Sequence, residues 1–163
     1  MTPAEKIDLL DKTLNRILGA IGSADAKVAQ LFAISTGMLG FEATIVAKIN
    51  PFILYDCILV AISALPLLFC IISLFMVLYP RLSGPPTSVL YFNKIAMSDG
   101  DCYKNRVNSL RSEDLLDDYA RQCHRNAEIA RDKFYWLRKA NIALFVATMP
   151  WLAVVIIGYA GSW

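Results

Sequence analysis

Three long apolar runs, separated by polar segments, dominate the pattern of the chain. They extend from Val28 to Ile49, from Phe52 to Tyr79 and from Asn141 to Tyr159. A helix needs about 20 apolar residues to cross the ~30 Å hydrocarbon core of a bilayer, and each run reaches or approaches that length. The pattern therefore predicts an all-α membrane protein with three transmembrane helices, over residues 28–49, 52–79 and 141–160.

Apolar positions at helical spacing also precede the first and third runs. They recur every three or four residues at Ile7, Leu10, Leu14, Ile17, Ile21, Ala24, Val28 and Leu31. The second set is Leu116, Ala120, Cys123, Ala127, Ala130, Phe134 and Leu137. Because this spacing is typical of amphipathic helices, two spans are predicted to extend into a cytoplasmic helical stalk. The two seams could pack against each other, or each against its own copy in an oligomer.

Local signals predict where the long helices begin and end. Thr2 and Glu5 have the spacing of a capping box, and Asn50-Pro51 stops a helix, so one helix is expected over residues 3–49. Ser112 marks the start of the second long helix, because acidic residues follow it in the first turn.

The segment between the second and third runs is predicted to be partly helical. Pro66 is expected to kink the second span. A short amphipathic helix is expected over residues 88–97, with Val89 and Phe92 on one face, and Asp99-Gly100-Asp101 is expected to break it.

The positive charges indicate an orientation. Of the sixteen Lys and Arg residues, all except Lys48 lie on one side of the implied topology. Since these residues concentrate in the cytoplasm, residues 1–27 and 80–140 are predicted to be cytoplasmic and the C-terminus periplasmic. Residues 81–139 hold eleven basic and eight acidic side chains, a net charge of +3. That excess fits an anionic lipid surface or a small anion and argues against nucleic-acid binding.

The side chains offer little for catalysis, so the protein is not expected to be an enzyme. His124 is the one histidine, and the four cysteines show no C-x-x-C spacing, which excludes the usual zinc patterns. We therefore expect no catalytic residue, no metal and no cofactor. The carboxylates Asp114, Asp117 and Asp118 are interpreted as a solvated helix face, with Asp117 and Arg121 spaced as an i, i+4 ion pair.

Polar and small residues within the first run indicate helix contacts. A charge in hydrocarbon costs at least ~2.5 kcal/mol, so Glu42 is predicted to be a pore or packing residue, or else a protonated or snorkelling carboxyl near the outer interface. Strips of small residues allow helices to pack closely in lipid. These strips are Ala29, Ala33 and Gly37, and Thr36, Gly40 and Thr44.

A polar stripe lies beside the second apolar seam. It combines amide, ammonium and aromatic groups, which can bind a nucleotide base and a phosphate, although a half-buried stripe more often satisfies neighbouring loops. Its members are Tyr119, Gln122, Asn126, Ile129, Lys133 and Trp136.

Several short segments resemble the transmembrane effectors of Pycsar antiphage systems. They are Ala24-Asp25-Ala26-Lys27, Leu90-Tyr91-Phe92-Asn93-Lys94-Ile95-Ala96, Gln122 through Lys133, and Leu137-Arg138-Lys139-Ala140. The resemblance implies an effector in the bacterial inner membrane that responds to cyclic CMP or cyclic UMP, impairs that membrane and causes abortive infection. The chain shows no pattern of a cyclic-nucleotide-binding β-roll, which leaves the manner of sensing open.

The resemblance and the charges together select candidate residues for the nucleotide. They are Asp25, Lys27, Tyr91, Lys94, Arg121, Arg125 and Lys133. Three spans are too few to enclose a sizeable pore, so a homo-oligomer in the lipid bilayer is expected, with Glu42 at its contacts. The alternatives are a constitutive holin-like protein that permeabilises membranes and a membrane scaffold that binds a cytoplasmic protein.

Overall fold

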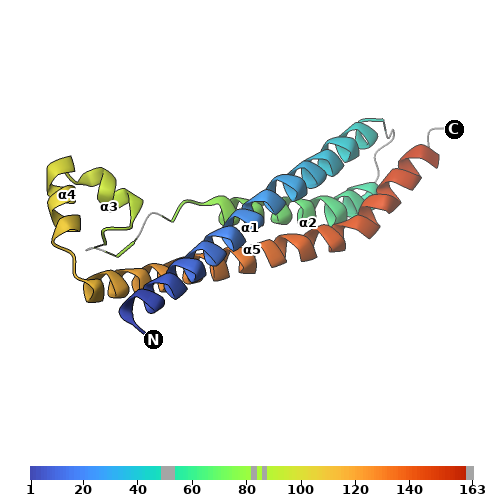
Figure 1. Cartoon of the computed structure of the whole chain (residues 1–163). Helices are drawn as coiled ribbons and strands as arrows, with labels where there is room; N and C mark the ends of the chain where they lie inside the picture. The colour runs from blue at the N-terminus through green and yellow to red at the C-terminus, as the bar shows by residue number, and fades with distance from the viewer. Residues whose placement is uncertain (49–53, 82–83, 86–87, 161–163) are drawn as a thin grey trace. The chain divides into compact units, whose positions relative to one another are not determined.

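The computed structural model describes residues 1–48, 54–81, 84–85 and 88–160. These residues form five helices: α1 (Pro3–Val46), α2 (Leu54–Leu78), α3 (Phe92–Met97), α4 (Gly100–Asn108) and α5 (Ser112–Ala160) (Figure 1). No strand occurs in these ranges. Three of the helices, α1, α2 and α5, are long and apolar enough to cross a membrane. The predicted all-α architecture with three candidate spans is confirmed, and α1 and α5 extend well beyond their apolar runs.

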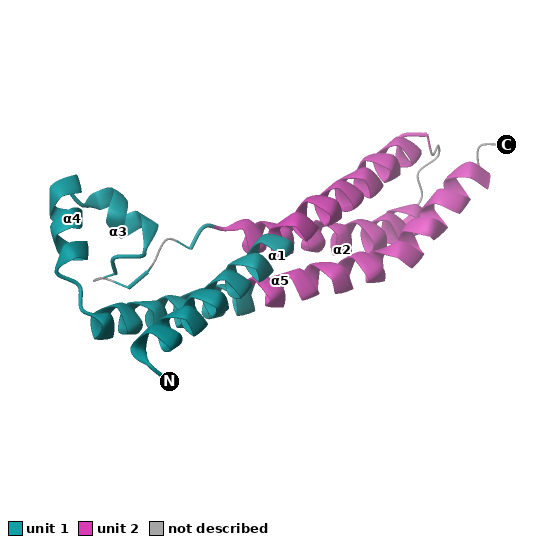
Figure 2. Ribbon diagram, viewed as in Figure 1, with its two compact units in different colours: residues 1–23, 80–132 teal, residues 24–79, 133–163 magenta. Residues whose placement is uncertain are grey.

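The chain divides into two compact units (Figure 2). The polar unit comprises residues 1–23 and 80–132, and the apolar unit comprises residues 24–79 and 133–163. The division falls inside α1 and inside α5, so each of these helices contributes residues to both units.

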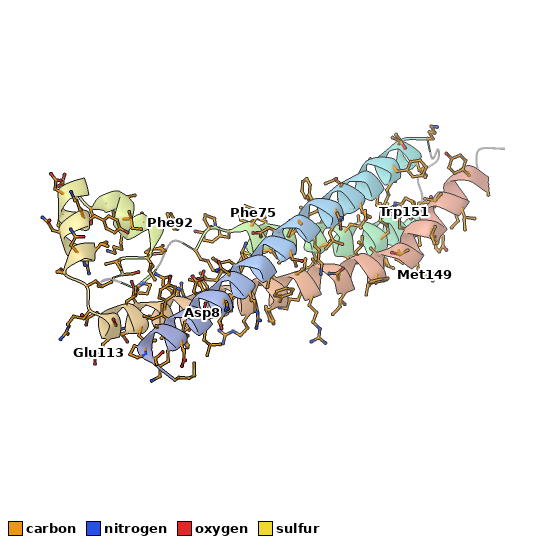
Figure 3. The ribbon with its side chains drawn as sticks, in the orientation of Figure 1. Asp8, Phe75, Phe92, Glu113, Met149 and Trp151 are labelled. Carbon is orange, nitrogen blue, oxygen red and sulfur yellow. The ribbon has the colours of Figure 1, made fainter. Side chains whose placement is uncertain are left out.

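Small side chains bring the three helices of the apolar unit together. Its core consists of Ala24 and Val28 from α1, Cys70, Leu74 and Val77 from α2, and Leu137, Ala140 and Ala143 from α5. A β-carbon at Gly158 would clash with the side chain of Ile45, so α5 needs glycine there to approach α1. In the same unit, the indole nitrogen of Trp151 donates to the carbonyl oxygen of Met38 at 2.9 Å (Figure 3).

The polar unit pairs the first half of α1 with α5. The thiol of Cys123 donates to the carbonyl oxygen of Leu10 at 3.3 Å, and the hydroxyl of Tyr119 donates to Asp11 at 3.3 Å. The two seams therefore meet within one chain. All eight predicted seam positions of α1 are buried or half-buried.

The predicted seam of α5 is partly wrong. Ala120, Ala127 and Phe134 are exposed, whereas Gln122 and Lys133 of the polar stripe are buried. The reason is that polar groups outside α5 bond to this stripe, which turns its face inward and turns the alanines outward. Helical periodicity places residues on a face but does not show which face finds partners.

The first helix begins where the capping signals predict and ends earlier than predicted. The backbone N–H of Glu5 donates to the hydroxyl of Thr2 at 3.3 Å, and the N–H of Thr2 donates to Glu5 at 2.8 Å, which confirms the capping box. The helix stops at Val46, before the predicted residue 49. The backbone N–H of Lys48 donates to the carbonyl oxygen of Ile45, three residues earlier, which forms a tighter turn than the α-helix.

The second span ends at Leu78, one residue before its predicted end at residue 79. Asn50-Pro51 and the start of the second run lie outside the described residues. The described helix α2 begins at Leu54, passes through Pro66 and ends at Leu78.

The segment after the second run folds differently from the prediction. The helix expected over residues 88–97 is confined to α3, because Ser88 accepts hydrogen bonds from the N–H groups of Leu90 and Tyr91 and forms a turn there. Val89 is 5% exposed and Phe92 is 64% exposed, so the two do not share a buried face.

Asp99-Gly100-Asp101 does separate two helices, but it also begins one that the sequence analysis missed. The side chain of Asp99 accepts hydrogen bonds from the backbone N–H groups of Asp101 and Cys102 at 3.1 and 3.4 Å, which caps α4.

Candidate functional site

A polar cavity of about 310 Å³ lies within the polar unit. It is formed by the end of α4, the segment around Val89 and the first turns of α5, and we call it the Asp118 cavity. Its lining comprises Val89, Arg106, Ser109, Leu110, Asp114, Asp117, Asp118 and Arg121. Sites for small molecules in proteins begin near ~300 Å³, so the cavity is large enough to hold a small polar ligand.

Asp118 is the buried carboxylate of this cavity. Its side chain is 8% exposed, and Oδ2 accepts hydrogen bonds from the backbone N–H groups of Val89 and Leu90 at 2.8 and 3.3 Å. Oδ1 is buried and has no hydrogen-bond partner among the described residues. Leaving a buried polar group without a partner costs about 1–3 kcal/mol, so this oxygen favours a donor in addition to those of the described residues. The prediction that Asp118 belongs to a solvated face is wrong.

The segment around Val89 is held in place by side chains of α4 and α5. The buried hydroxyl of Ser88 accepts a hydrogen bond from the amide of Gln122 at 2.8 Å. Asn126 in turn donates to the carbonyl oxygen of Gln122 at 2.9 Å, and the hydroxyl of Tyr103 donates to the carbonyl oxygen of Val89 at 3.1 Å. This network fixes one wall of the cavity, so Gln122 of the polar stripe satisfies a neighbouring loop.

The other two carboxylates of the cavity are paired with arginines. Nε of Arg121 lies 2.8 Å from Asp117, which confirms the predicted i, i+4 pair. Nε of Arg111 lies 3.0 Å from Asp114, and this hydrogen bond holds the pKa of Asp114 below its ordinary value and raises the pKa of Arg111. Exposed pairs of this kind stabilise a fold by only about 0–1 kcal/mol, and the side chain of Arg121 is 57% exposed. An anionic ligand can therefore draw Arg121 away from Asp117 at little cost.

The seven residues predicted to bind a nucleotide do not form one group. Tyr91, Lys94, Arg121 and Arg125 belong to the polar unit, whereas Asp25, Lys27 and Lys133 belong to the apolar unit. Of these seven, the lining of the cavity includes Arg121.

The other polar-unit candidates lie in different surroundings. The guanidinium of Arg125 lies 3.0 Å from Glu128. The ring of Tyr91 packs edge-on against Phe92, with 5.1 Å between ring centroids. Lys94, in α3, is half-buried.

Asp25 and Lys133 form an ion pair between α1 and α5. Nζ of Lys133 lies 2.5 Å from the Asp25 carboxylate, and the Lys133 side chain is almost fully buried. Both charges are satisfied by each other, which is the arrangement that a buried charge requires. Lys27, two residues from Asp25, is exposed.

Glu42 lies in the contact between α1 and α2. It is buried, and Oε1 accepts a hydrogen bond from the hydroxyl of Ser63, while Oε2 has no partner among the described residues. The small-residue strips do not belong to this contact between α1 and α2. A β-carbon at Gly37 or Gly40 would meet open space. Apart from the half-buried Thr36, the residues of both strips are exposed, so they leave a helix surface of small side chains that another helix or lipid can contact.

Two further groups near α1 have shifted acidities. Burial raises the pKa of the Cys123 thiol and the pKa of the Tyr119 hydroxyl, and the nearby carboxylate of Asp11 raises both further. Both groups are therefore protonated at neutral pH, which suits hydrogen-bond donors between helices and not reactive nucleophiles.

The sequence analysis missed most of the cavity, including Val89, Arg106 and Ser109. One signal was available: Asp118 lies four residues before Gln122 and so extends the polar stripe by one helical turn. The contribution of α4 could not be found in this way, because it depends on where that helix packs.

One comparison with known proteins gives a match. The family model described as Pycsar effector protein domain (PycTM) matches residues 9–160 of the 163 residues. Neither the curated proteins nor the solved structures that were compared give a match. The matched region includes the cavity, all of α2 and α5, and most of α1.

Proposed function

The chain belongs to the Pycsar effector protein domain family, and from this premise we propose that it is a membrane effector that cyclic CMP or cyclic UMP switches on during phage infection. In the active state it impairs the bacterial inner membrane and ends the growth of the infected cell. It acts by binding and movement, without catalysing a reaction. The observation that carries the proposal is that one family match includes both a polar cavity and three candidate membrane spans.

The cavity has the two kinds of group that a cyclic mononucleotide requires. Arg106 and Arg121 bring guanidinium groups, which bind phosphate oxygens well, to its lining. Val89 and Leu110 add apolar surface against which the flat face of a base can lie. These residues replace most of the seven first selected from the sequence as the sites to test.

The long helices supply a route by which binding affects the membrane. In α5, cavity residues Asp114 to Arg121 lie in the first three turns, and the third apolar run begins at residue 141 of the same helix. A ligand shifts such an equilibrium only by its difference in affinity for the two states, and about 5.5 kcal/mol converts a 1:99 mixture to 99:1. Binding that closes the cavity would stabilise one arrangement of α5 over another.

The active form is an oligomer in this proposal, because three spans cannot enclose a sizeable pore. The exposed strip around Gly37 and Gly40 offers a surface on which spans of neighbouring copies can pack closely. The polar pair of Glu42 and Ser63 lies on α1 and α2, so a rearrangement of these helices would expose a carboxylate to a water-filled path.

A leakage experiment tests the proposal. The full chain is reconstituted into liposomes of bacterial lipids loaded with a self-quenched dye, and cyclic CMP, cyclic UMP or cyclic AMP is added at equal concentration. We expect release with at least one of the pyrimidine nucleotides and none with cyclic AMP or without ligand.

The other outcomes are equally informative. Release without any nucleotide would replace the proposal with a constitutive, holin-like activity. Tight liposomes under all conditions would contradict membrane impairment and favour a scaffold.

A further inference from the structure

We infer that the chain binds one anionic phospholipid between α2 and α5, with an acyl chain in a groove of the apolar unit and the lipid phosphate at Lys139. Both helices belong to this unit (Figure 2), so the inference does not depend on the nucleotide or on the polar unit. It follows from the shape of the groove, from its apolar lining and from the one ammonium group that it contains.

The groove has a volume of about 450 Å³, and we call it the Lys139 groove. Its lining comprises Leu65, Pro66 and Phe69 of α2 and Lys139, Ile142, Ala143 and Val146 of α5. The large aliphatic and aromatic side chains of this lining are exposed, whereas Ala143 is 6% exposed. A small buried residue thus forms the floor, and larger residues of two helices form the walls. Because every lining residue except Lys139 is apolar, a hydrocarbon chain suits this groove.

Lys139 places a positive charge where the third span begins. It lies two residues before the third apolar run, which starts at Asn141. Its Nζ lies 4.4 Å from the centre of the Tyr135 ring and 4.6 Å from that of the Trp136 ring, one turn earlier in α5. The methylene stem therefore lines the groove, and the ammonium group lies toward the polar end of the helix. Trp and Tyr side chains are typical of the level at which lipid headgroups lie.

The charge of this ammonium group is available to a ligand. Within the described part of the chain, no carboxylate lies at ion-pair distance from it. Its ring contacts hold it in place without neutralising its charge. Arg138 and Lys27 are also exposed. They lie at a similar level, because Ala24 of α1 and Leu137 of α5 belong to one core cluster.

The charges of the chain favour a lipid over a second copy as the occupant. The acidic residues of the apolar unit are Asp25, Glu42 and Asp56. Asp25 is paired with Lys133, and Glu42 is buried. Asp56 lines a small cavity with Val154, near the other end of α5. The spans of another copy therefore bring no unpaired carboxylate to the level of Lys139, whereas every phospholipid carries a phosphate there.

The selectivity of the groove concerns the headgroup and not the chain. Lipid tails are as apolar as the groove, so a chain gains little by moving into it from the bilayer. The difference between lipids comes from charge, because a Lys or Arg side chain near the surface attracts anionic lipids. Phosphatidylcholine carries a choline cation beside its phosphate, which repels the ammonium group. Phosphatidylglycerol has a net negative charge and should be the stronger ligand.

Native mass spectrometry of the full chain in an uncharged detergent tests the site. Phosphatidylglycerol and phosphatidylcholine with identical acyl chains are titrated separately, and the masses give the number of lipids bound and the affinity for the first. We expect the first phosphatidylglycerol to bind about fivefold more tightly, the factor that ~1 kcal/mol for one Lys near anionic lipid gives. Glycerol phosphate, which lacks acyl chains, should not displace it.

The variant Lys139→Gln assigns the preference to this side chain. Glutamine keeps a polar side chain but removes the charge, so the two lipids should bind with equal affinity. The matched control is Lys48→Gln. Lys48 is exposed and lies near the end of the first apolar run, but it does not line the groove, so this change should leave the preference as it was.

The variant Phe69→Ala tests the groove itself. It removes one wall and should weaken the binding of both lipids by the same factor, because contacts with the chain are common to both. The control is Phe75→Ala, because Phe75 (Figure 3) is an exposed residue of α2 outside the lining. That change should leave both affinities as they were.

A change on the ligand serves if a variant fails to fold. Phosphatidylglycerol with a methylated phosphate keeps both chains but has no charge, and it should bind the unaltered chain no better than phosphatidylcholine.

Four results would overturn the inference. They are equal affinities for the two lipids in the unaltered chain, an equal loss of preference in Lys139→Gln and Lys48→Gln, displacement of the lipid by glycerol phosphate, and lipid-free dimers that disappear in Phe69→Ala. The last result would assign the groove to a second copy. Leakage in response to a nucleotide is a separate measurement, so each of these results leaves the proposed function intact.

Discussion

Arg121 combines a weak partner with a useful position. Its side chain is largely exposed and paired with Asp117 on the next turn of the same helix, and it also lines the cavity. Exposed pairs between neighbouring turns contribute little to stability. Such a guanidinium can exchange one carboxylate for a phosphate without loosening the fold.

Replacing this arginine should affect both pyrimidine nucleotides alike. Arg121→Gln removes the charge but keeps a polar side chain, and we expect the affinity for cyclic CMP and for cyclic UMP to fall about 10- to 100-fold, because hydrogen bonds to charged groups are worth about 1.5–3 kcal/mol. Calorimetry on the full chain measures both values. The ratio between them should stay constant, since a phosphate contact carries no information about the base.

The matched control for this change is Arg111→Gln. Arg111 is exposed and also pairs with a carboxylate on its own helix, Asp114, but it is not among the cavity residues. Its loss should leave both affinities within a factor of about two. A fall that is the same for both arginines would indicate a general effect of charge and would remove Arg121 from the site.

At the scale of the elements, α1 and α2 are joined by a polar contact inside an apolar unit. The hydroxyl of Ser63 donates to Glu42, and both side chains are buried. Polar contacts between helices in membranes are worth about 0.6 kcal/mol on average and up to about 1.7 kcal/mol. The contact therefore fixes which faces of α1 and α2 meet more than it stabilises the fold.

Removing the hydroxyl should weaken this contact. In Ser63→Ala the Glu42 carboxyl loses its partner, and we expect the free energy of unfolding in detergent to fall by about 1–2 kcal/mol. Circular dichroism during titration with a denaturing detergent measures the loss. Ser35→Ala is the control, because that buried hydroxyl donates to carbonyl oxygens of its own helix. Equal losses in the two variants would show that Glu42 and Ser63 add nothing beyond burial.

At the scale of the whole molecule, the proposed function requires the cavity to face the interior of the cell, where cyclic nucleotides are made. The distribution of Lys and Arg predicts this orientation, since fifteen of the sixteen fall in residues 1–27 and 81–139 and such residues concentrate in cytoplasmic segments. Cys102 can report on it, because this thiol is exposed and belongs to α4, which contributes to the cavity.

Labelling of Cys102 from each side of the membrane tests the orientation. A maleimide that cannot cross membranes should modify it in inverted membrane vesicles and not in intact spheroplasts. The variant Cys102→Ser identifies the part of the signal that belongs to this thiol, so that Cys57, which is also exposed, does not confuse the result. Modification of Cys102 in spheroplasts would place the cavity outside the cell and would refute activation by an intracellular nucleotide.

The sequence by itself determined the three long helices, because their signals are local. Run length predicted the three spans, the Thr2–Glu5 capping box predicted the start of α1, and Ser112 predicted the start of α5. The i, i+4 spacing likewise predicted the ion pair between Asp117 and Arg121. Each depends on residues a few positions apart, which a helix brings together whatever the rest of the chain does.

Only the tertiary structure decided the site. Asp114, Asp117 and Asp118 look equivalent in the sequence, yet Asp118 is buried because the N–H groups of Val89 and Leu90, 29 and 28 residues away, bond to it. The partner of Lys133, likewise, is Asp25, 108 residues earlier. Contacts at such separations follow from how a loop or a second helix packs, and that depends on shape and on hydrogen bonds which no short pattern records. Helical spacing determined which residues share a face of a helix, and packing determined which of those faces lines the cavity.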